Sequence, residues 1–203
     1  MSFIFWKEEP QTRKWKWIPN THLARAGAIK SGAMFFTWTA FSCQPGNGSE
    51  PMRFGHLPLD FDNKADPERA LDEMRNLCLI VLLESFEIDA HEIQFFCSGA
   101  KGFHAVIPSY VIGSEAGHPK LPLIYKAMVH RWAESLKLKT LDLTMYAMGA
   151  GKMFRIPNVK RQNGRYKVPL SLEEVRSMSF KDLWEMSEYP REEFHGDAFE
   201  SFL

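Results

Sequence analysis

The hexapeptide LPLDFD, residues 57–62, joins an apolar run to two carboxylates that stand one residue apart. Side chains on a β-strand point alternately to its two faces, so we expect Asp60 and Asp62 to share one face while the apolar residues point to the other. Two carboxylates about 7 Å apart on one strand face repel each other unless a cation lies between them. Hard oxygen ligands in this arrangement suit magnesium or manganese. The hexapeptide therefore predicts a metal site at the end of a strand.

A second segment, FCSGAKGFH at residues 96–104, sets polar side chains around a turn that contains two glycines. Ser98 supplies a hydroxyl, Lys101 an ammonium group and His104 an imidazole. Glycines let a backbone approach a ligand closely, and this combination of groups suits phosphate binding. Together with the carboxylate pair, the segment predicts metal-dependent phosphoryl chemistry.

The periodicity of the remaining sequence predicts a mixed α and β fold. Strands are expected over residues 33–43, 53–62, 92–98, 102–108 and 140–146, with a closing pair at 153–157 and 165–170. Helices are expected from Pro67 through an apolar series that reaches Leu82, and over residues 121–136, and Ser171 and Ser179 each begin a capping-box pattern. From residue 53 the order β-α-β-β-α-β is that of a ferredoxin-like or RNA-recognition-type sheet, preceded by an extra α/β portion.

Composition is that of an ordinary globular protein. The chain has 203 residues, of which 45% are hydrophobic and 25% charged, enough for one large domain or two closely packed halves. No apolar run approaches the length of a membrane span and no signal-peptide pattern is present, so we expect no membrane partner. Cys43, Cys78 and Cys97 are too few and too scattered for a disulfide framework or a four-ligand zinc site, which fits a cytoplasmic location.

Charge is balanced overall but uneven along the chain. The formal net charge is zero, so bulk charge gives no support for nucleic-acid binding. Residues 152–167 nevertheless contain no Asp or Glu and hold six basic residues: Lys152, Arg155, Lys160, Arg161, Arg165 and Lys167. This basic strip is read equally well as an anion-binding face or as a solvated edge strand.

In chain order, these segments resemble the catalytic core of the archaeo-eukaryotic primase superfamily, the primase-polymerases. Asp60-Phe61-Asp62 resembles the family's Asp-x-Asp/Glu pair, residues 98–104 resemble its Ser-x-His-like motif, and Asp142 resembles its third, isolated acid. The run FRIPNVKRQNGRYKVPL, residues 154–170, resembles the Arg-x-Pro stretch that leads to Gly and Val-Pro-Leu. The resemblance spans roughly residues 30–175.

The resemblance implies an α+β fold in which an N-terminal α/β portion packs on an RRM-like (ferredoxin-like) sheet unit. The implied boundaries are a primase-polymerase catalytic domain at 1–175, divided into the N-terminal portion at 1–52 and the RRM-like unit with the metal site at 53–170, and a C-terminal helical tail at 171–203. The chain shows neither the Cys/His cluster of relatives with a zinc module nor the Gly-x-x-x-x-Gly-Lys-Ser/Thr motif of a helicase.

The resemblance also implies roles for individual residues. Asp60 and Asp62 would bridge two Mg²⁺ or Mn²⁺ ions, and Asp142 would bind mainly the catalytic one. The residues implied to bind the nucleotide are Ser98, Lys101, His104, Arg155, Lys160 and Arg161. For Lys160, Arg161 and Lys167 the sequence leaves three places open: the triphosphate, the template backbone and the plain surface.

The implied activity is that of a template-dependent nucleotidyltransferase, a DNA primase/polymerase that joins nucleotides to a 3′-hydroxyl with pyrophosphate release in DNA replication. The expected partners are a single-stranded DNA template, a primer, nucleoside triphosphates and a helicase or accessory primase domain on the same or another chain. Three alternatives stay open: an end-joining repair polymerase of the bacterial ligase type, a metal-dependent phosphohydrolase or nuclease, and an inert replication-initiation module that binds DNA. The preference for ribo- or deoxynucleotides and the ability to start synthesis de novo also stay open.

Overall fold

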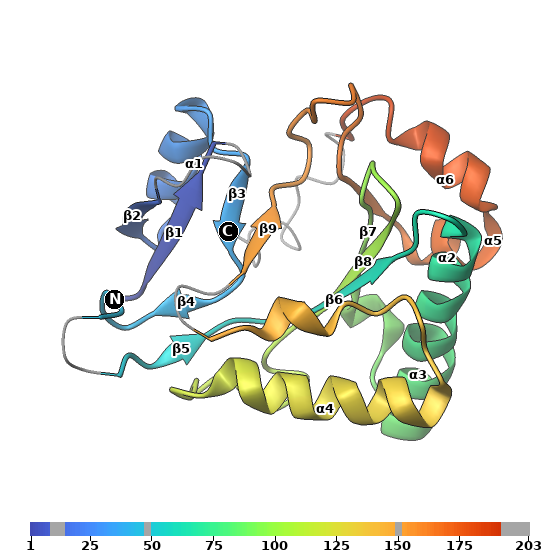
Figure 1. Cartoon of the computed structure of the whole chain (residues 1–203), viewed down its shortest axis with the longest axis horizontal. Coiled ribbons are helices and arrows are strands. Elements are labelled where there is room, and N and C mark those ends of the chain that lie inside the picture. Colours follow the sequence, from blue (N-terminus) through green and yellow to red (C-terminus); the bar gives the residue numbers. More distant parts are fainter. Residues whose placement is uncertain (9–14, 47–49, 149–151, 192–203) are drawn as a thin grey trace.

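The computed structural model describes residues 1–8, 15–46, 50–148 and 152–191. In these ranges the chain forms two antiparallel β-sheets and several helices, which confirms the mixed α+β class. Figure 1 shows the first sheet on the left and the second on the right, with strand β9 between them.

The first sheet takes short strands from both ends of the chain. They are β1 (Phe3–Lys7), β2 (Lys16–Pro19), β3 (Phe35–Thr37), β4 (Ala40–Phe41), β5 (Arg53–Phe54) and β9 (Met153–Arg155). Their order is β5-β4-β1-β3-β9, and β2 also pairs with β1. Helix α1 (His22–Lys30) begins at Thr21, whose side chain accepts a hydrogen bond from the Ala24 amide. Its Ala28 packs on Ile4 and Phe36 in a small core of this sheet.

The second sheet has the order β10-β7-β8-β6. Its strands are β6 (Leu57–Asp62), β7 (Gln94–Cys97), β8 (Gly102–Ile107) and β10 (Val168–Leu170). The predicted strands 92–98 and 102–108 are confirmed as the hairpin β7–β8, joined by the turn that begins at Ser98.

Residues 140–142 extend the second sheet along the outer edge of β6. Leu141 forms an isolated bridge with Phe61, the Asp62 amide donates to the Thr140 carbonyl at 2.8 Å, and the Asp142 amide donates to the Asp60 carbonyl at 2.8 Å. With this segment counted as a minimal strand, the second sheet has the connectivity β-α-β-β-α-β expected from the sequence, and β10 is added at its other edge.

Helices cover the face of the second sheet that points away from the first. They are α2 (Pro67–Arg75), the π-helical turn η1 (Asn76–Val81), α3 (Leu82–Phe86) and α4 (Leu121–Leu136), and a 3₁₀ turn η2 (Ala90–Glu92) precedes β7. Helix α2 begins where predicted, with Asp66 capping the Arg69 amide and Pro67 in the first turn.

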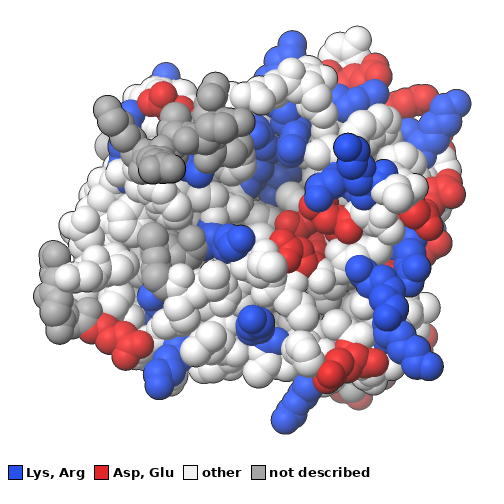
Figure 2. Space-filling model, viewed as in Figure 1, with Lys and Arg blue, Asp and Glu red and all other residues white. Residues whose placement is uncertain are grey.

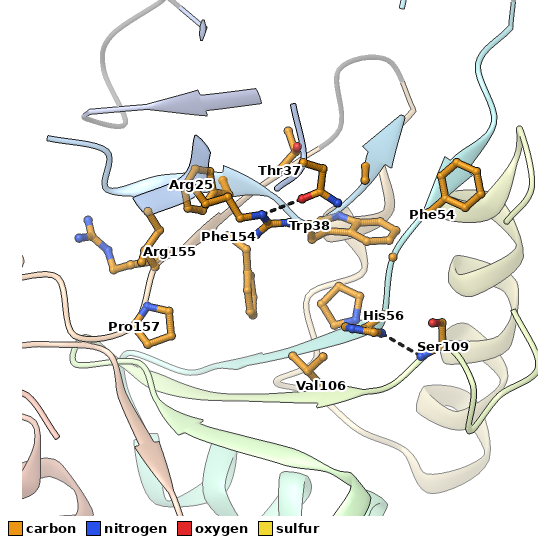
Figure 3. A pocket seen from close by; sticks show the side chains of 16 residues that line it. Arg25, Thr37, Trp38, Phe54, His56, Val106, Ser109, Phe154, Arg155 and Pro157 are labelled. Atoms are coloured by element: carbon orange, nitrogen blue, oxygen red, sulfur yellow. Dashed lines mark hydrogen bonds between the residues drawn. The ribbon is translucent and has the colours of Figure 1, made fainter. Parts of the chain in front are cut away.

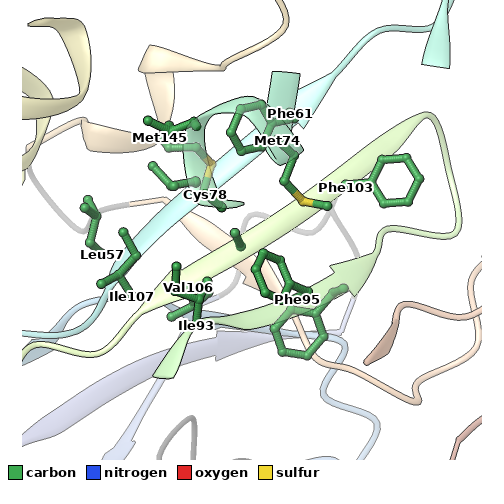
Figure 4. Close-up of a cluster of buried hydrophobic side chains, with 14 of the residues drawn as sticks. Leu57, Phe61, Met74, Cys78, Ile93, Phe95, Phe103, Val106, Ile107 and Met145 are labelled. Carbon is green, nitrogen blue, oxygen red and sulfur yellow. The ribbon is translucent and has the colours of Figure 1, made fainter. Parts of the chain in front are cut away.

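The main core lies between these helices and the second sheet (Figure 4). Leu57, Leu59 and Phe61 of β6 are fully buried there, together with Phe103 of β8 and Met74 of α2. This face of β6 and β8 is therefore apolar throughout, as the alternation in residues 57–62 predicts. No helix in the described ranges combines the length and the apolar character needed to cross a membrane.

Two short helices follow β10, α5 (Leu172–Ser177) and α6 (Phe180–Met186). Both predicted capping boxes are confirmed, at Ser171 with Glu174 and at Ser179 with Asp182. Arg75 of α2 donates to the Val175 carbonyl, which ties these helices to the main core. Residues 192–203 of the predicted helical tail lie outside the described part of the chain.

Two predicted strands are each divided. Residues 33–43 form β3 and β4, and residues 53–62 form β5 in the first sheet and β6 in the second. The second division falls at Gly55, where a Cβ atom would lie 2.6 Å from the Trp38 carbonyl oxygen. The chain passes from one sheet to the other at this point, and residue patterns within a strand do not report which sheet it joins.

Two further expectations are corrected. Residues 153–157 and 165–170 do not form a closing pair, since β9 belongs to the first sheet and β10 to the second, and only Lys160 and Tyr166 bridge between them in the described structure. The expected strand 140–146 is extended only around Leu141 and then becomes a 3₁₀ helix, η3 (Leu143–Tyr146). Asp142 starts that helix because its carboxylate accepts a hydrogen bond from the Thr144 amide at 2.7 Å.

Candidate functional site

The two aspartates of β6 lie on the face of the second sheet that is turned toward the first sheet. The strand register sets Asp60 opposite His104 and Asp62 opposite Gly102, with Phe96 of β7 beside His104. Because side chains alternate, Asp60, Asp62 and His104 share this face. The predicted carboxylate pair and the predicted histidine are thus brought together by adjacent strands.

Asp60 is the most enclosed acid of the site. Its Oδ1 is buried and has no hydrogen-bond partner among the described residues, and His104 Nε2 lies 3.4 Å from it without hydrogen-bond alignment. Burial raises the pKa of Asp60, but nearby His104, Lys167 and Lys101 outweigh burial and hold the pKa below its usual value. Asp60 is therefore ionised, and its Oδ1 accepts no aligned hydrogen bond from the described residues.

Asp62 is paired with the lysine of the β7–β8 turn. Lys101 Nζ lies 2.8 Å from Asp62 Oδ2, and this hydrogen bond is the main cause of a raised Lys101 pKa. Asp60 and Asp142 raise it further, so the ammonium group lies within the field of all three predicted acids. An ion pair this exposed contributes little free energy, and a cation or a phosphate group can replace it at small cost.

Asp142 lies on the neighbouring strand segment but its carboxylate is occupied. The Asp142 amide donates to the Asp60 carbonyl, while both carboxylate oxygens accept from Thr144, at 2.7 Å from its amide and 2.9 Å from its hydroxyl. Lys152 Nζ in turn donates to the Thr144 hydroxyl at 3.3 Å. The third acid is thus close in the sheet to the pair but turned onto its own helix.

These contacts decide how the site fits a metal ion. In the part of the chain that the structure describes, no group of three or more His, Cys, Asp and Glu side chains stands close enough to hold one. Among the three acids, Asp62 is bound to Lys101 and Asp142 to Thr144. The buried Asp60 Oδ1 does fit a cation, because it makes no aligned hydrogen bond within the described residues and has His104 Nε2 beside it only at 3.4 Å.

The turn between β7 and β8 is tightly constrained. The Ser98 hydroxyl accepts hydrogen bonds from the Ala100 and Gly102 amides, each at 3.2 Å. A Cβ atom at Gly99 would lie 2.1 Å from the Tyr166 carbonyl oxygen, and one at Gly102 would lie 1.8 Å from the Phe61 carbonyl oxygen. Neighbouring backbone therefore leaves no room for a side chain at Gly99 or Gly102. The buried Ser98 hydroxyl stabilises the turn through its two hydrogen bonds.

Arg161 and Arg155 of the basic strip reach this face. Arg161 donates to the Ser98 carbonyl at 3.0 Å, which places its guanidinium against the turn. Arg155 is buried, lies over the Phe35 ring at 4.4 Å, and has an Nη1 atom without a hydrogen-bond partner among the described residues. Burial, followed by repulsion from Arg161, lowers the pKa of Arg155 to about 10. Lys160 is exposed, and no described contact joins it to the carboxylates.

Lys167 is fully buried, so it does not belong to the plain surface, one of the three places that the sequence left open for it. Its Nζ donates to the Arg155 carbonyl at 3.2 Å and lies 3.7 Å from the centre of the Phe154 ring. Burial lowers its pKa well below the usual value, while Asp60 opposes that shift. Alternation within residues 165–170 places Lys167 on the same face as the acids and is the signal that could have predicted this position.

Phe154 also packs on His104, with ring centres 4.6 Å apart, and sequence reasoning gave it no role. It forms a wall of a cavity of about 220 Å³ between the two sheets (Figure 3). Other walls come from Trp38 and Arg25 on the side of the first sheet and from Pro58 and Val106 of the second. The cavity adjoins the carboxylates, because Pro58, two residues before Asp60, and Val106, two residues after His104, lie opposite each other on the same sheet face.

Surface charge gathers around the same region. Figure 2 shows acidic side chains together near the middle of one face, with Lys and Arg on both sides of them and more basic side chains in an adjacent hollow. Such a juxtaposition suits a ligand that is itself an anion but binds with cations. The sequence matches none of the protein-family models and none of the curated proteins with which it was compared.

Proposed function

We propose that this chain is a template-dependent nucleotidyltransferase, a DNA primase/polymerase with an archaeo-eukaryotic primase-type core that acts in DNA replication. One observation carries the proposal: three acids on adjacent strands, Asp60, Asp62 and Asp142, lie near His104 of β8 and Lys101 of the tight turn that precedes it. In phosphoryl transfer the protein mainly positions the reacting groups and neutralises the charge on the phosphates. The proposed arrangement of acids, lysine and histidine would do both.

Each residue has a defined task in the proposed reaction. Asp60, Asp62 and Asp142 hold Mg²⁺ or Mn²⁺, which when bound activates the 3′-hydroxyl and neutralises the departing pyrophosphate. Lys101 leaves Asp62 and binds a phosphate oxygen of the incoming nucleotide. Arg161, already at the turn, donates to the same phosphates, and a guanidinium does so with two parallel hydrogen bonds.

The basic groups beneath the site have a supporting task. Lys167, which interacts electrostatically with Asp60, and Arg155, whose carbonyl accepts a hydrogen bond from Lys167, are both buried beneath the site and would supply polar groups near the triphosphate. Ser98 keeps the turn in shape. The partners in this proposal are a single-stranded DNA template, a primer, nucleoside triphosphates, and a helicase or accessory primase domain on the same or another chain.

The decisive experiment is incubation of the full chain with a single-stranded template, Mn²⁺ or Mg²⁺ and labelled nucleotides, with and without a primer. We expect template-dependent incorporation and an equal yield of pyrophosphate, both lost in Asp60→Asn. Strand cleavage, or phosphate release without incorporation, would assign the site to a hydrolase or nuclease instead. Extension only of primed, gapped ends would assign it to end-joining repair.

A second candidate is an inert DNA-binding module, and the occupied Asp62 and Asp142 carboxylates favour it. The two candidates differ in metal affinity. Calorimetric titration of the full chain with Mn²⁺ in the presence of a non-hydrolysable nucleoside triphosphate should show binding that Asp60→Asn removes. Template binding without such metal binding would support the inert module.

A further inference from the structure

The ammonium group of Lys167 lies between two aromatic rings at the sheet face that carries Asp60. Its Nζ is 3.7 Å from the centre of the Phe154 ring and 4.3 Å from the centre of the Phe96 ring. Phe154 belongs to β9 of the first sheet, and Phe96 belongs to β7 of the second. The same Nζ donates to the Arg155 carbonyl of β9 at 3.2 Å. One buried ammonium group therefore contacts both sheets at this point.

A charge in this position is costly unless its neighbours favour the charged form. Burial opposes the ammonium form of Lys167, whereas the two ring faces, the Arg155 carbonyl and the nearby Asp60 favour it. A methionine of similar length would fill the same space without the cost of enclosing a charge. The charge therefore provides contacts that an apolar side chain of this size would not: attraction to both rings and a hydrogen bond to β9.

His104 depends on packing for its orientation. Its Nδ1 has no hydrogen-bond partner among the described residues, and its Nε2 lies 3.4 Å from Asp60 Oδ1 without hydrogen-bond alignment. The Phe154 ring packs on the imidazole, with ring centres 4.6 Å apart and planes tilted by 37°. Because no aligned hydrogen bond within the described residues fixes the imidazole, its angle toward Asp60 is set by this ring contact.

We infer that Lys167 is a positioning residue that holds Phe154 against His104 and so sets the angle of the imidazole. The contacts form a continuous series from the ammonium group through the phenyl ring to the imidazole and on to the carboxylate of Asp60. Lys167 acts through His104 and does not touch the nucleotide. This inference rests on the proposed function in taking His104 as a nucleotide-binding group.

The first measurement uses the full chain without substrate. Lys167→Met keeps an unbranched side chain between the rings and removes the charge. Proton NMR should show displaced His104 imidazole resonances, because the Phe154 ring moves relative to the imidazole, and the spectrum of His104→Gln assigns those resonances. Lys126→Met removes an exposed charge on α4 and, as the matched control, should leave them in place. Unchanged His104 resonances in Lys167→Met that urea unfolding shows to be folded would overturn the inference.

A double-mutant cycle measures the consequence for nucleotide binding. Calorimetry with the full chain, Mg²⁺ and a non-hydrolysable nucleoside triphosphate should show that Lys167→Met weakens binding by roughly five- to tenfold. In the His104→Gln background the same substitution should weaken binding by at most about twofold, because the group through which it acts is gone. A lysine that only stabilises the fold, or that attracts the triphosphate directly, would weaken binding by the same factor in both backgrounds. That result would overturn the inference.

Phe154→Leu covers the case in which Lys167→Met does not fold. It keeps an apolar side chain but removes the ring between the ammonium group and the imidazole. It should displace the His104 resonances and weaken nucleotide binding by a similar factor, again only where His104 is present. Nucleotide incorporation by the wild type together with equal effects in both backgrounds would overturn the inference alone. Displaced His104 resonances in a protein whose wild type incorporates no nucleotide would overturn the proposed function alone.

Discussion

At the scale of single residues, the candidate site is a group of three acids, two of which are already bound to other side chains. Lys101 on Asp62 and Thr144 on Asp142 satisfy two of the acids, whereas Asp60 Oδ1 has no hydrogen-bond partner among the described residues. The site is thus only partly preorganised for a metal ion, and the exposed Lys101–Asp62 pair is its most easily changed contact.

Asp60→Asn should abolish nucleotide incorporation while the protein stays folded. The substitution keeps the shape of the side chain but removes the charge that a cation requires. Incorporation assays and thermal unfolding of the same preparation measure the two effects. Near-normal incorporation by Asp60→Asn would remove Asp60 from the catalytic assignment.

Lys101→Gln should have opposite effects on the two ligands. Without the ammonium group Asp62 is free for a cation, so Mn²⁺ affinity should rise by up to about fivefold, the value of an exposed ion pair. The Michaelis constant for the nucleotide should rise by about ten- to a hundredfold through loss of a charge-assisted hydrogen bond. Calorimetry and steady-state kinetics separate the two, and a fall in both Mn²⁺ affinity and the Michaelis constant would contradict the placement of Lys101.

His104→Gln should raise the Michaelis constant for the nucleotide more than it changes affinity for DNA. His104 lies under Phe154 beside Asp60, within the proposed nucleotide site and away from exposed surface. A rise of about ten- to a hundredfold is expected from the loss of one hydrogen bond to a charged phosphate. Weaker template binding with an unchanged Michaelis constant would place His104 at the template instead.

At the scale of elements, helix α2 fixes the strand segment that carries Asp142. Glu73 of α2 accepts hydrogen bonds from the Lys139 amide at 2.7 Å, the Thr140 amide at 2.8 Å and the Thr140 hydroxyl at 2.9 Å. Thr140 in turn accepts from the Asp62 amide. One carboxylate therefore holds the edge segment against β6, although sequence patterns gave Glu73 no role.

Glu73→Ala should destabilise the protein by about 2–3 kcal/mol and reduce incorporation, because it leaves the partly buried amide and hydroxyl of Thr140 without an acceptor. Burial raises the pKa of Glu73, but hydrogen bonds from Arg69, Thr140 and Lys139 outweigh it and hold the pKa below its usual value. A lowered folded-state pKa stabilises the protein above the unfolded pKa of about 4.3, and this stabilisation is lost as the pH falls through the folded-state value.

Urea unfolding of wild type and Glu73→Ala at pH 7 and at about pH 3.5 tests both statements. The difference in unfolding free energy should be smaller at the lower pH, where the wild-type carboxylate becomes protonated. A difference that stays constant between the two pH values would show that Glu73 acts only by packing.

At the scale of the whole molecule, two sheets enclose the site, and β9 with the buried Lys167 joins them. Lys167 precedes β10 of the second sheet and donates to Arg155 in β9 of the first. The basic strip is thereby divided: Lys167 and Arg155 lie inside, whereas Lys160 is exposed. The aromatic residues Trp15 and Trp17 of the N-terminal segment pack with Phe5, while Arg13 and Lys14 lie outside the described residues.

Binding to a single-stranded template should be weak and steeply dependent on salt, because the net charge is zero and the attraction comes only from a local basic strip. Lys160→Gln should lower the slope of log affinity against log salt concentration by about 0.7, the value for one phosphate contact on a single strand. Lys167→Met should leave that slope unchanged, since Lys167 is inside the protein. Fluorescence anisotropy across a salt series measures the slopes. An unchanged slope in Lys160→Gln would move the template path to the N-terminal segment around Trp15 and Trp17.

The sequence by itself determined the features that depend only on residues close together along the chain, namely which side chains share a strand face and where helices begin. Alternation placed Asp60 and Asp62 on one face and Leu59 and Phe61 in the core, and Pro67, Ser171 and Ser179 marked helix starts, because strand alternation and helix capping are local. The serine, lysine and histidine of residues 98–104 were likewise placed correctly around the turn of a hairpin.

Only the tertiary structure decided which elements meet. The passage of the chain between sheets at Gly55, the close approach of Phe61 to Gly102 and the burial of Lys167 all depend on residues far away in the sequence. The same holds for the position of Asp142, whose amide donates to the Asp60 carbonyl on a strand far away in the sequence. Such contacts follow from packing of whole sheets and helices, and a pattern within one segment does not contain that information.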